Sequence, residues 1–169
     1  MIDPFWDFSV KLYESPGAAA ECLQLQDDYG VDVNVLLFCA YTAVIVGTRL
    51  TEQNLADIER HVAEIRTGVI APLRDCRRAM KAAAMSLTNG DGERAQYLRS
   101  QVKELELVAE RLEQERLVGW LNAGVRVDCR SGTMELEGNL RRLLARHIRH
   151  GRTAPYPVNL AKAAQELVK

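Results

Sequence analysis

Four side chains that carry oxygen ligands crowd into eight positions of the sequence: Asp27, Asp28, Asp32 and Asn34. The spacing Asp28-x-x-x-Asp32 is typical of paired carboxylates that hold magnesium for a diphosphate substrate. Gly30 lies between the two carboxylates and predicts a helix end there, so they need not share a helical face. The cluster therefore marks a candidate site, although its spacing does not by itself predict a metal.

Two interpretations of this cluster stay open. In the one we favour, Asp32 caps the following helix, and Asn34 and Gln26 satisfy backbone groups at a buried turn. In the alternative, the cluster is one wall of a pocket for an anionic or diphosphate-type small molecule. That pocket would be lined by Trp6, Tyr41 and Asp32, with Arg74 as an anion anchor.

The basic residues are concentrated in one run near the C-terminus. At helical spacing, Arg142, Arg146 and Arg149 project together, opposite a row of leucines. We favour a solvated face over a phosphate or nucleic-acid site, because the aromatic residues that stack on single-stranded bases are missing. The whole chain has 22 basic and 23 acidic residues, so its net charge does not favour nucleic acid or an anionic membrane as a partner.

Signatures of metal and nucleophilic chemistry are missing from the sequence. His147 and His150 lie three residues apart, but no Glu-x-x-His motif accompanies them, which argues against a di-iron bundle. The sequence contains neither a Cys-x-x-Cys pair nor a Gly-x-Ser-x-Gly motif nor a glycine-rich phosphate loop. We expect no metal and no cofactor, and a protein that is not an enzyme.

The cysteines and the N-terminus favour the cytoplasm. The four cysteines lie among apolar residues, where we expect buried free thiols of the kind found in reducing compartments: Cys22, Cys39, Cys76 and Cys129. Asp3 and Asp7 stand where a secretory signal would carry basic residues. The longest apolar run, Val33 to Val46, has 14 residues and is shorter than the roughly 18 that span a bilayer. It predicts a buried central helix, and we expect no membrane partner.

Two long amphipathic segments predict an antiparallel helix hairpin, residues 52–87 and 91–118, joined by a turn at 88–92. A kink is expected at Pro72, with the helix continuing through it. We expect Arg74 to approach Glu104 or Glu106, and Arg66 to approach Glu113. The apolar face of the second helix is predicted to pack against the first, and its residues are Ala95, Leu98, Val102, Leu105, Val108 or Ala109, and Leu112.

Shorter elements are predicted at both ends of the chain. A helix follows Pro4, and a second, capped by Ser15, runs from Ala18 to about Tyr29. Residues 119–132 are predicted to be irregular, because the alternation at Val125, Val127 and Cys129 has no partner strand. Further helices are expected at 133–150 and 158–168.

One pattern in the first half of the chain carries a family resemblance. It is Gln-Asp-x-x-Gly-x-Asp-Val-Asn-x-Leu-Leu-Phe-Cys, from Gln26 to Cys39. Here the sequence resembles a family of small bacterial proteins defined only as a conserved domain of unknown function. The likeness extends to residues 5–9, 72–74, 104–106 and 110–113 and covers most of the first 115 residues. It implies a bacterial, soluble, helical protein and brings no catalytic residues.

The sequence therefore predicts an all-α protein, a single helical domain over residues 1–169 with a long hairpin around a buried central helix. The main bundle is expected at 1–118, and an irregular connector with C-terminal helices at 119–169. The favoured function is a non-catalytic protein-interaction or regulatory module, with a protein partner or a homodimer formed through the hairpin. The alternative is a small-molecule binding or enzymatic bundle with its site near Asp32.

Overall fold

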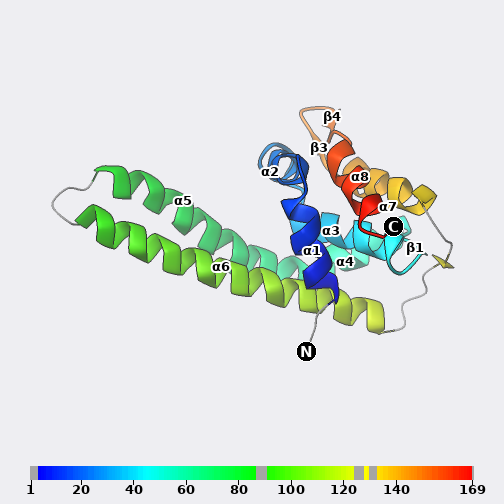
Figure 1. The fold of residues 1–169 in the computed structure, drawn as a ribbon, viewed down its shortest axis with the longest axis horizontal. Helices are drawn as coiled ribbons and strands as arrows, with labels where there is room; N and C mark the ends of the chain where they lie inside the picture. The colour runs from blue at the N-terminus through cyan, green and yellow to red at the C-terminus, as the bar shows by residue number, and fades with distance from the viewer. Residues whose placement is uncertain (1–3, 87–90, 124–127, 130–132, 169) are drawn as a thin grey trace. The chain divides into compact units, whose positions relative to one another are not determined.

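The computed structural model describes residues 4–86, 91–123, 128–129 and 133–168, and most of these are helical (Figure 1). This confirms the predicted all-α class.

The chain forms two compact units. We call residues 1–59 and 117–169 the core unit, and residues 60–116 the hairpin unit. One domain over the whole chain stays a prediction. The elements in chain order are α1 (Pro4–Glu14), α2 (Ala18–Tyr29), α3 (Val33–Val44), β1 (Thr48–Arg49), α4 (Glu52–Ile65), η1 (Arg66–Ile70), α5 (Ala71–Ser86), α6 (Asp91–Asn122), β2 (Asp128–Cys129), α7 (Thr133–Ala145), β3 (Ile148–Arg149), β4 (Arg152–Thr153) and α8 (Val158–Glu166).

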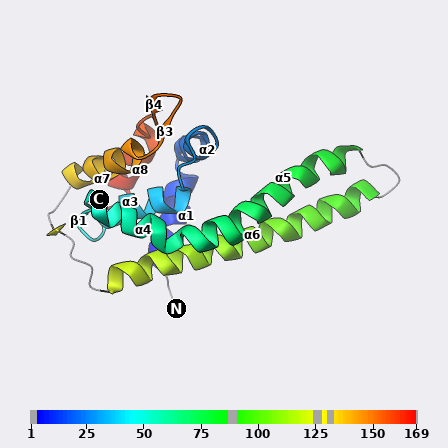
Figure 2. The same ribbon diagram turned by 180° about the vertical axis from the view of Figure 1, so that it is seen from behind.

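The centre of the core unit is α3, which contacts α1, α2, α7 and α8 (Figures 1 and 2). Six successive residues of α3, 35–40, are buried. A helix that is apolar all round has no face to offer water, so it must be surrounded by other elements. The predicted buried central helix is confirmed. Among the described residues, no helix is long and apolar enough to cross a membrane.

Local signals set most of the helix ends as predicted. Gly30, with a φ of 72°, ends α2, and its N–H bonds to the Gln26 carbonyl. At the start of α4, the Thr51 hydroxyl accepts from the Asn54 N–H at 3.1 Å, and the Asn54 side chain accepts from the Thr51 N–H at 2.9 Å. The predicted Ser15 cap of α2 is wrong, because its hydroxyl donates to the Lys11 carbonyl and Gly17 precedes the helix instead.

The predicted helix at 133–150 is too long. Helix α7 ends at Ala145, and β3 and β4 follow as a small antiparallel hairpin in which Ile148 lies opposite Thr153. Its two turn residues, His150 and Gly151, have φ values of 51° and 73°. Two left-handed residues in a two-residue loop are typical of tight β-hairpins. The helical pattern of apolar residues therefore continued past the true end of the helix.

A second correction concerns the connector. Residues 128–129 form β2, which pairs antiparallel with β1 so that Cys129 lies opposite Thr48. The prediction that no partner strand exists is wrong, because a two-residue strand such as β1 has no room for an alternating pattern. Positions 125 and 127 of the predicted alternation lie outside the described residues.

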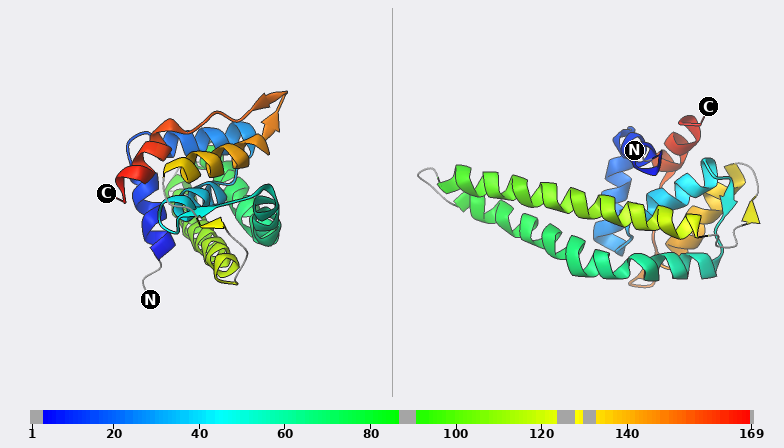
Figure 3. Two further views of the ribbon diagram at one scale, coloured as in Figure 1. Left: turned by 90° about the vertical axis from the view of Figure 1, so that its right-hand side faces the viewer. Right: turned by 90° about the horizontal axis from the view of Figure 1, so that it is seen from below.

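The hairpin unit contains the end of α4, the π-helical turn η1, α5 and most of α6. At the end of η1, the Ala71 N–H bonds to the Arg66 carbonyl five residues earlier. This π turn immediately precedes Pro72, which has no N–H to donate, and the helix continues through it as predicted. Helices α5 and α6 run antiparallel, side by side (Figure 3). Of the predicted turn at 88–92, residues 88–90 lie outside the described residues, and the last two belong to α6.

Candidate interaction surface

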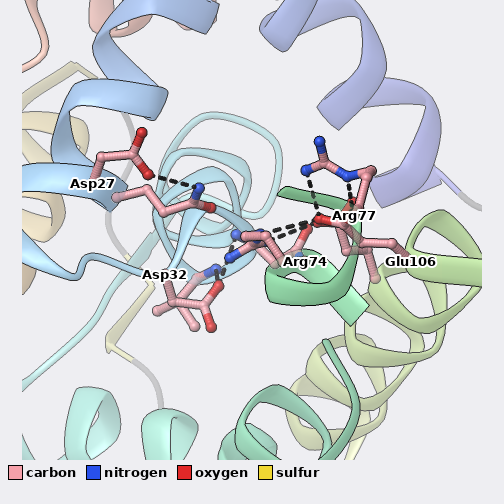
Figure 4. A network of polar contacts seen from close by, with 9 residues as sticks. Asp27, Asp32, Arg74, Arg77 and Glu106 are labelled. Carbon is pink, nitrogen blue, oxygen red and sulfur yellow. Dashed lines mark hydrogen bonds and ion pairs between the residues drawn. The ribbon is translucent and has the colours of Figure 1, made fainter. Parts of the chain in front are cut away.

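The carboxylate cluster lies in the core unit, where α2 ends and α3 begins. Asp27 and Asp28 are exposed in the last turn of α2. One oxygen of Asp32, Oδ1, accepts from the backbone N–H of Asn34 at 2.9 Å and of Val35 at 3.2 Å (Figure 4). Asp32 is thus the N-cap of α3, as predicted. The predicted contact of Gln26 with a backbone group is not found among the described residues, because its Nε2 donates to the Asp27 side chain at 3.5 Å.

The other residues of the alternative pocket have structural surroundings of their own. The Tyr41 ring packs on Phe5 and Phe8, with centroids 5.1 and 5.5 Å apart. Trp6 is half-buried on α1. Arg74 belongs to the hairpin unit, where it pairs with two glutamates. A ligand-binding role for these residues stays a prediction.

The three arginines of the basic run do not share a helical face, because α7 ends before the last two. Arg142 donates to the Leu50 carbonyl at 3.3 Å. Arg149, on β3, donates to the carbonyls of Asp27 and Asp28 at the end of α2, where a cation complements the helix dipole. Each contact joins segments of the core unit that are far apart in the sequence.

Arg146 forms the centre of an ion-pair cluster in the core unit. Its guanidinium lies 2.7 Å from Glu59 and 3.6 Å from Glu52, and His147 lies 3.4 Å from Glu59. Burial alone would raise the pKa of Glu59, but hydrogen bonds from His147 and Arg146 and their charges lower it to about 2. Glu59 is therefore ionised at neutral pH.

Asn139 is a structural residue that the sequence analysis missed. Its side chain is fully buried on α7, accepts from the Leu50 N–H at 2.8 Å and donates to the Thr48 carbonyl at 2.9 Å and more weakly to the Cys39 carbonyl at 3.4 Å. It ties α7 to α3 and β1. The signal was available, because Asn139 interrupts the leucine stripe of α7, and a polar residue in such a stripe is usually a satisfied buried hydrogen-bonding group.

The cysteines differ in exposure. Cys22 and Cys39 are buried free thiols, as predicted, and burial raises the pKa of Cys22 to about 12 and that of Cys39 further. Cys76 is exposed on α5, so the prediction is wrong there. The Cys129 side chain lies outside the described residues. Within the described parts of the chain, no group of three or more His, Cys, Asp or Glu side chains is placed to hold a metal ion.

Charged side chains form the seam between the two helices of the hairpin unit. Glu106 of α6 is only 5% exposed, and it accepts from Arg74 at 3.1 Å and from Arg77 at 3.2 Å (Figure 4). Arg74 also donates to Glu110 at 2.9 Å. The predicted approach of Arg74 to Glu106 is confirmed. Burial alone would raise the pKa of Glu106, but hydrogen bonds from Arg77 and Arg74 lower it.

The leucines of α6 that belong to the hairpin unit are exposed. We call the exposed residues Leu98, Leu105, Val108 and Leu112 the α6 stripe; their exposed fractions are 55%, 57%, 67% and 49%. The prediction that these four residues pack against the first helix is wrong, whereas Ala109, which it gave as the alternative to Val108, is buried. A different face is buried, formed by Glu106, Ala109 and Glu113. Both faces have helical spacing, and the ion pairs to Arg74 and Arg77 lie on the face that is buried.

The spacing of the α6 stripe is that of a coiled-coil seam. Leu98, Leu105 and Leu112 are seven residues apart, and Val108 fills the intervening position of the second heptad. Leu107 is also 44% exposed, but it lies about 160° around the helix from Leu105 and is not part of the stripe. The arrangement offers a binding surface for another helix.

Comparison with known proteins gives one match. The model of a family described as "Protein of unknown function (DUF2390)" matches residues 4–117. The matched segment includes the cluster at Asp32 and the whole α6 stripe. No curated protein and no solved structure matches the chain.

Proposed function

This chain belongs to the DUF2390 family of proteins of unknown function, and we propose that it is a non-catalytic interaction or regulatory module that binds a protein helix along the α6 stripe. One observation carries the proposal: four large apolar side chains at heptad spacing are about half or more exposed on one face of α6. Contiguous exposed apolar surface of this kind marks protein interaction sites.

The chemistry of the stripe favours a helical partner. Knobs at seven-residue spacing fit the holes of a facing helix, and an amphipathic helix would bury them. Removing apolar surface from water contributes about 25 cal/mol per Å², so four half-exposed side chains support a moderate affinity. The ion pairs of Glu106 with Arg74 and Arg77 hold an adjacent face of α6, about 100° around the helix from Leu105, which supports a preformed binding face.

We favour this function over a small-molecule site near Asp32. Asp32 Oδ1 is engaged by two backbone N–H groups, and Arg74 is engaged by Glu106 and Glu110. A thermal-shift panel of divalent cations, diphosphates and nucleotides tests the alternative. Stabilisation that Asp32→Asn abolishes would support the alternative and count against the interaction module.

Photo-crosslinking in the producing cell tests the interaction directly. A photoreactive amino acid is placed at Val108, on the stripe, or at Leu107, which is exposed on another face of the same helix. We expect a discrete protein adduct from position 108 that is much weaker from position 107. Equal adducts from both positions, or no adduct from position 108, would contradict the proposed function.

We further propose that the protein works in the bacterial cytoplasm. The buried thiols of Cys22 and Cys39 suit a reducing compartment. Rapid alkylation of denatured cell extracts should modify these cysteines fully, and their recovery as disulfides would contradict this location.

A further inference from the structure

The partner of the α6 stripe can be identified from the charges beside it. Resting on the proposed function above, we infer that the stripe binds a second copy of this chain, with the two α6 helices antiparallel. Leu98, Leu105 and Leu112 take the a positions of a heptad, and the corresponding d positions are Gln101, Val108 and Glu115.

An antiparallel pair places the most apolar layers at its centre. In this arrangement an a position of one helix faces a d position of the other. Leu105 then meets Val108 of the second copy, and the two-fold axis repeats the contact. Outside these layers Leu112 meets Gln101. The stripe is about 21 Å long from Leu98 to Leu112, so the apolar centre is short and its ends are polar.

The flanking charges are complementary only in this orientation. Glu104 and Arg111 are exposed and lie seven residues apart, both at g positions on the same side of the stripe. Antiparallel pairing brings g positions together, so Glu104 faces Arg111 of the second copy, and symmetry gives two such pairs. Parallel pairing would bring Arg111 towards Arg116 of the second copy, where like charges repel. Flanking charges of this kind set orientation in coiled coils.

Two contacts that these charges make within the chain are weak. Within the chain, Gln101 Nε2 lies 3.5 Å from Glu104, and Arg111 lies 3.9 Å from Glu115. Both contacts are long and exposed, and exposed pairs contribute little to stability. Exchanging these two contacts for pairs across an interface therefore loses little.

Sedimentation equilibrium of the full chain, from about 1 µM to about 1 mM, measures self-association. We expect a reversible dimer that Leu105→Ala weakens about thirtyfold, because each dimer loses two buried leucine side chains. Leu107→Ala, the matched control on another face, should leave the dissociation constant unchanged. Circular dichroism checks that both variants keep the helical content of the wild type.

Charge reversal tests the orientation. In the antiparallel dimer, Arg111→Glu sets a second carboxylate against Glu104 at both symmetry-related contacts and should weaken association about tenfold. In a parallel dimer the same change would face Arg116 and strengthen association. The double variant with Glu104→Arg and Arg111→Glu swaps both charges and should restore wild-type affinity. Stronger association of the single variant, or no rescue by the double, would overturn the antiparallel arrangement.

The two levels of the proposal fail differently. A chain that stays monomeric at every concentration, while position 108 crosslinks to a protein of another mass, overturns the homodimer and leaves the interaction module intact. A monomer with no adduct at position 108 overturns both. A dimer that is insensitive to Leu105→Ala also overturns this inference, because that dimer forms through another surface.

Discussion

The two units of the molecule use their side chains in opposite ways. The core unit turns its aromatic residues inward: the Phe5 and Phe38 rings lie 5.3 Å apart at their centroids, and Phe38 and Trp120 lie 6.3 Å apart. The hairpin unit turns charges inward, with Glu106 between Arg74 and Arg77, and leaves the α6 stripe exposed.

This difference shows that the side chains that stabilise a unit need not be those that form its binding surface. Burial of apolar surface is the main favourable term in folding, and the core unit uses it fully. Ion pairs fix the register of the two hairpin helices but contribute less net free energy, because their desolvation offsets much of the attraction. The apolar surface of α6 thereby stays available for binding.

The largest effect is expected in the core unit. Phe38→Ala removes a fully buried ring from α3 together with its contacts to Phe5 and Trp120. We expect the free energy of unfolding to fall by about 4 kcal/mol in denaturant titrations. A loss below about 1 kcal/mol would mean that the centre of the core unit is not α3, and would remove the contrast between the units.

A smaller effect is expected at the hairpin seam. Glu106→Gln leaves two guanidinium groups beside a neutral amide and should cost about 2 kcal/mol, because both arginine side chains keep some contact with water. Hydrogen exchange of the α5 and α6 amides reports this locally. Glu104→Gln, an exposed neighbour on α6, is the control and should change exchange little at low concentration, where the chain is monomeric. Equal effects would show that the buried charges do not hold the hairpin.

Acid should destabilise the core unit through Glu59. Its pKa is about 2 in the folded protein and about 4.3 in an unfolded chain, so the folded state binds fewer protons between these values. The resulting stabilisation is complete above the unfolded pKa and is lost as the pH falls from about 5 to about 2. Glu59→Gln should cost roughly 1.5 kcal/mol at pH 7 and flatten the acid limb of the stability profile. If Glu59→Gln lost stability in acid as steeply as the wild type does, this role of Glu59 would be contradicted.

Local signals predicted much of the fold. The cap at Asp32, the stop at Gly30 and the start at Thr51 each depend on residues within a few positions, and the structure confirms them. Burial of α3 follows from its composition alone. The contact of Arg74 with Glu106 could be predicted from the lengths of the two helices and the short turn between them.

The predictions that were wrong depended on tertiary contacts. Two faces of α6 have helical spacing. The more apolar face was predicted to be buried, and this was wrong because the pattern of one helix does not show the ion pairs that its other face forms with α5. The β3–β4 hairpin was hidden because Ile148 continues the leucine pattern of α7, although His150-Gly151 was a turn signal. Pairing of β1 with β2 joins residues about 80 positions apart and leaves no local pattern. The candidate surface thus became visible only when packing selected the buried face.

The cap at Asp32 should have a modest effect. Asp32→Ala removes the acceptor of two N–H groups at the start of α3 and should cost about 1 kcal/mol, measured by thermal or denaturant unfolding. Asp32→Asn should keep most of the cap, since asparagine is an equally good N-cap residue. Asp28→Ala, in the exposed last turn of α2, is the control. If both Asp32→Ala and Asp32→Asn lowered the free energy of unfolding by well over 1 kcal/mol, the carboxylate charge would have a role beyond capping.

The smallest effect is expected on the α6 stripe, and it gives the sharpest test of the contrast. Leu105→Ala, measured at low concentration where the chain is monomeric, should change the free energy of unfolding by no more than about 0.5 kcal/mol, because the side chain is already more than half exposed. The same variant should still weaken self-association. A leucine that matters for binding and not for folding is the signature of an interface. If Leu105→Ala instead destabilised the monomer as a core substitution does, the stripe would be part of the folded interior and the contrast between the two units would fail.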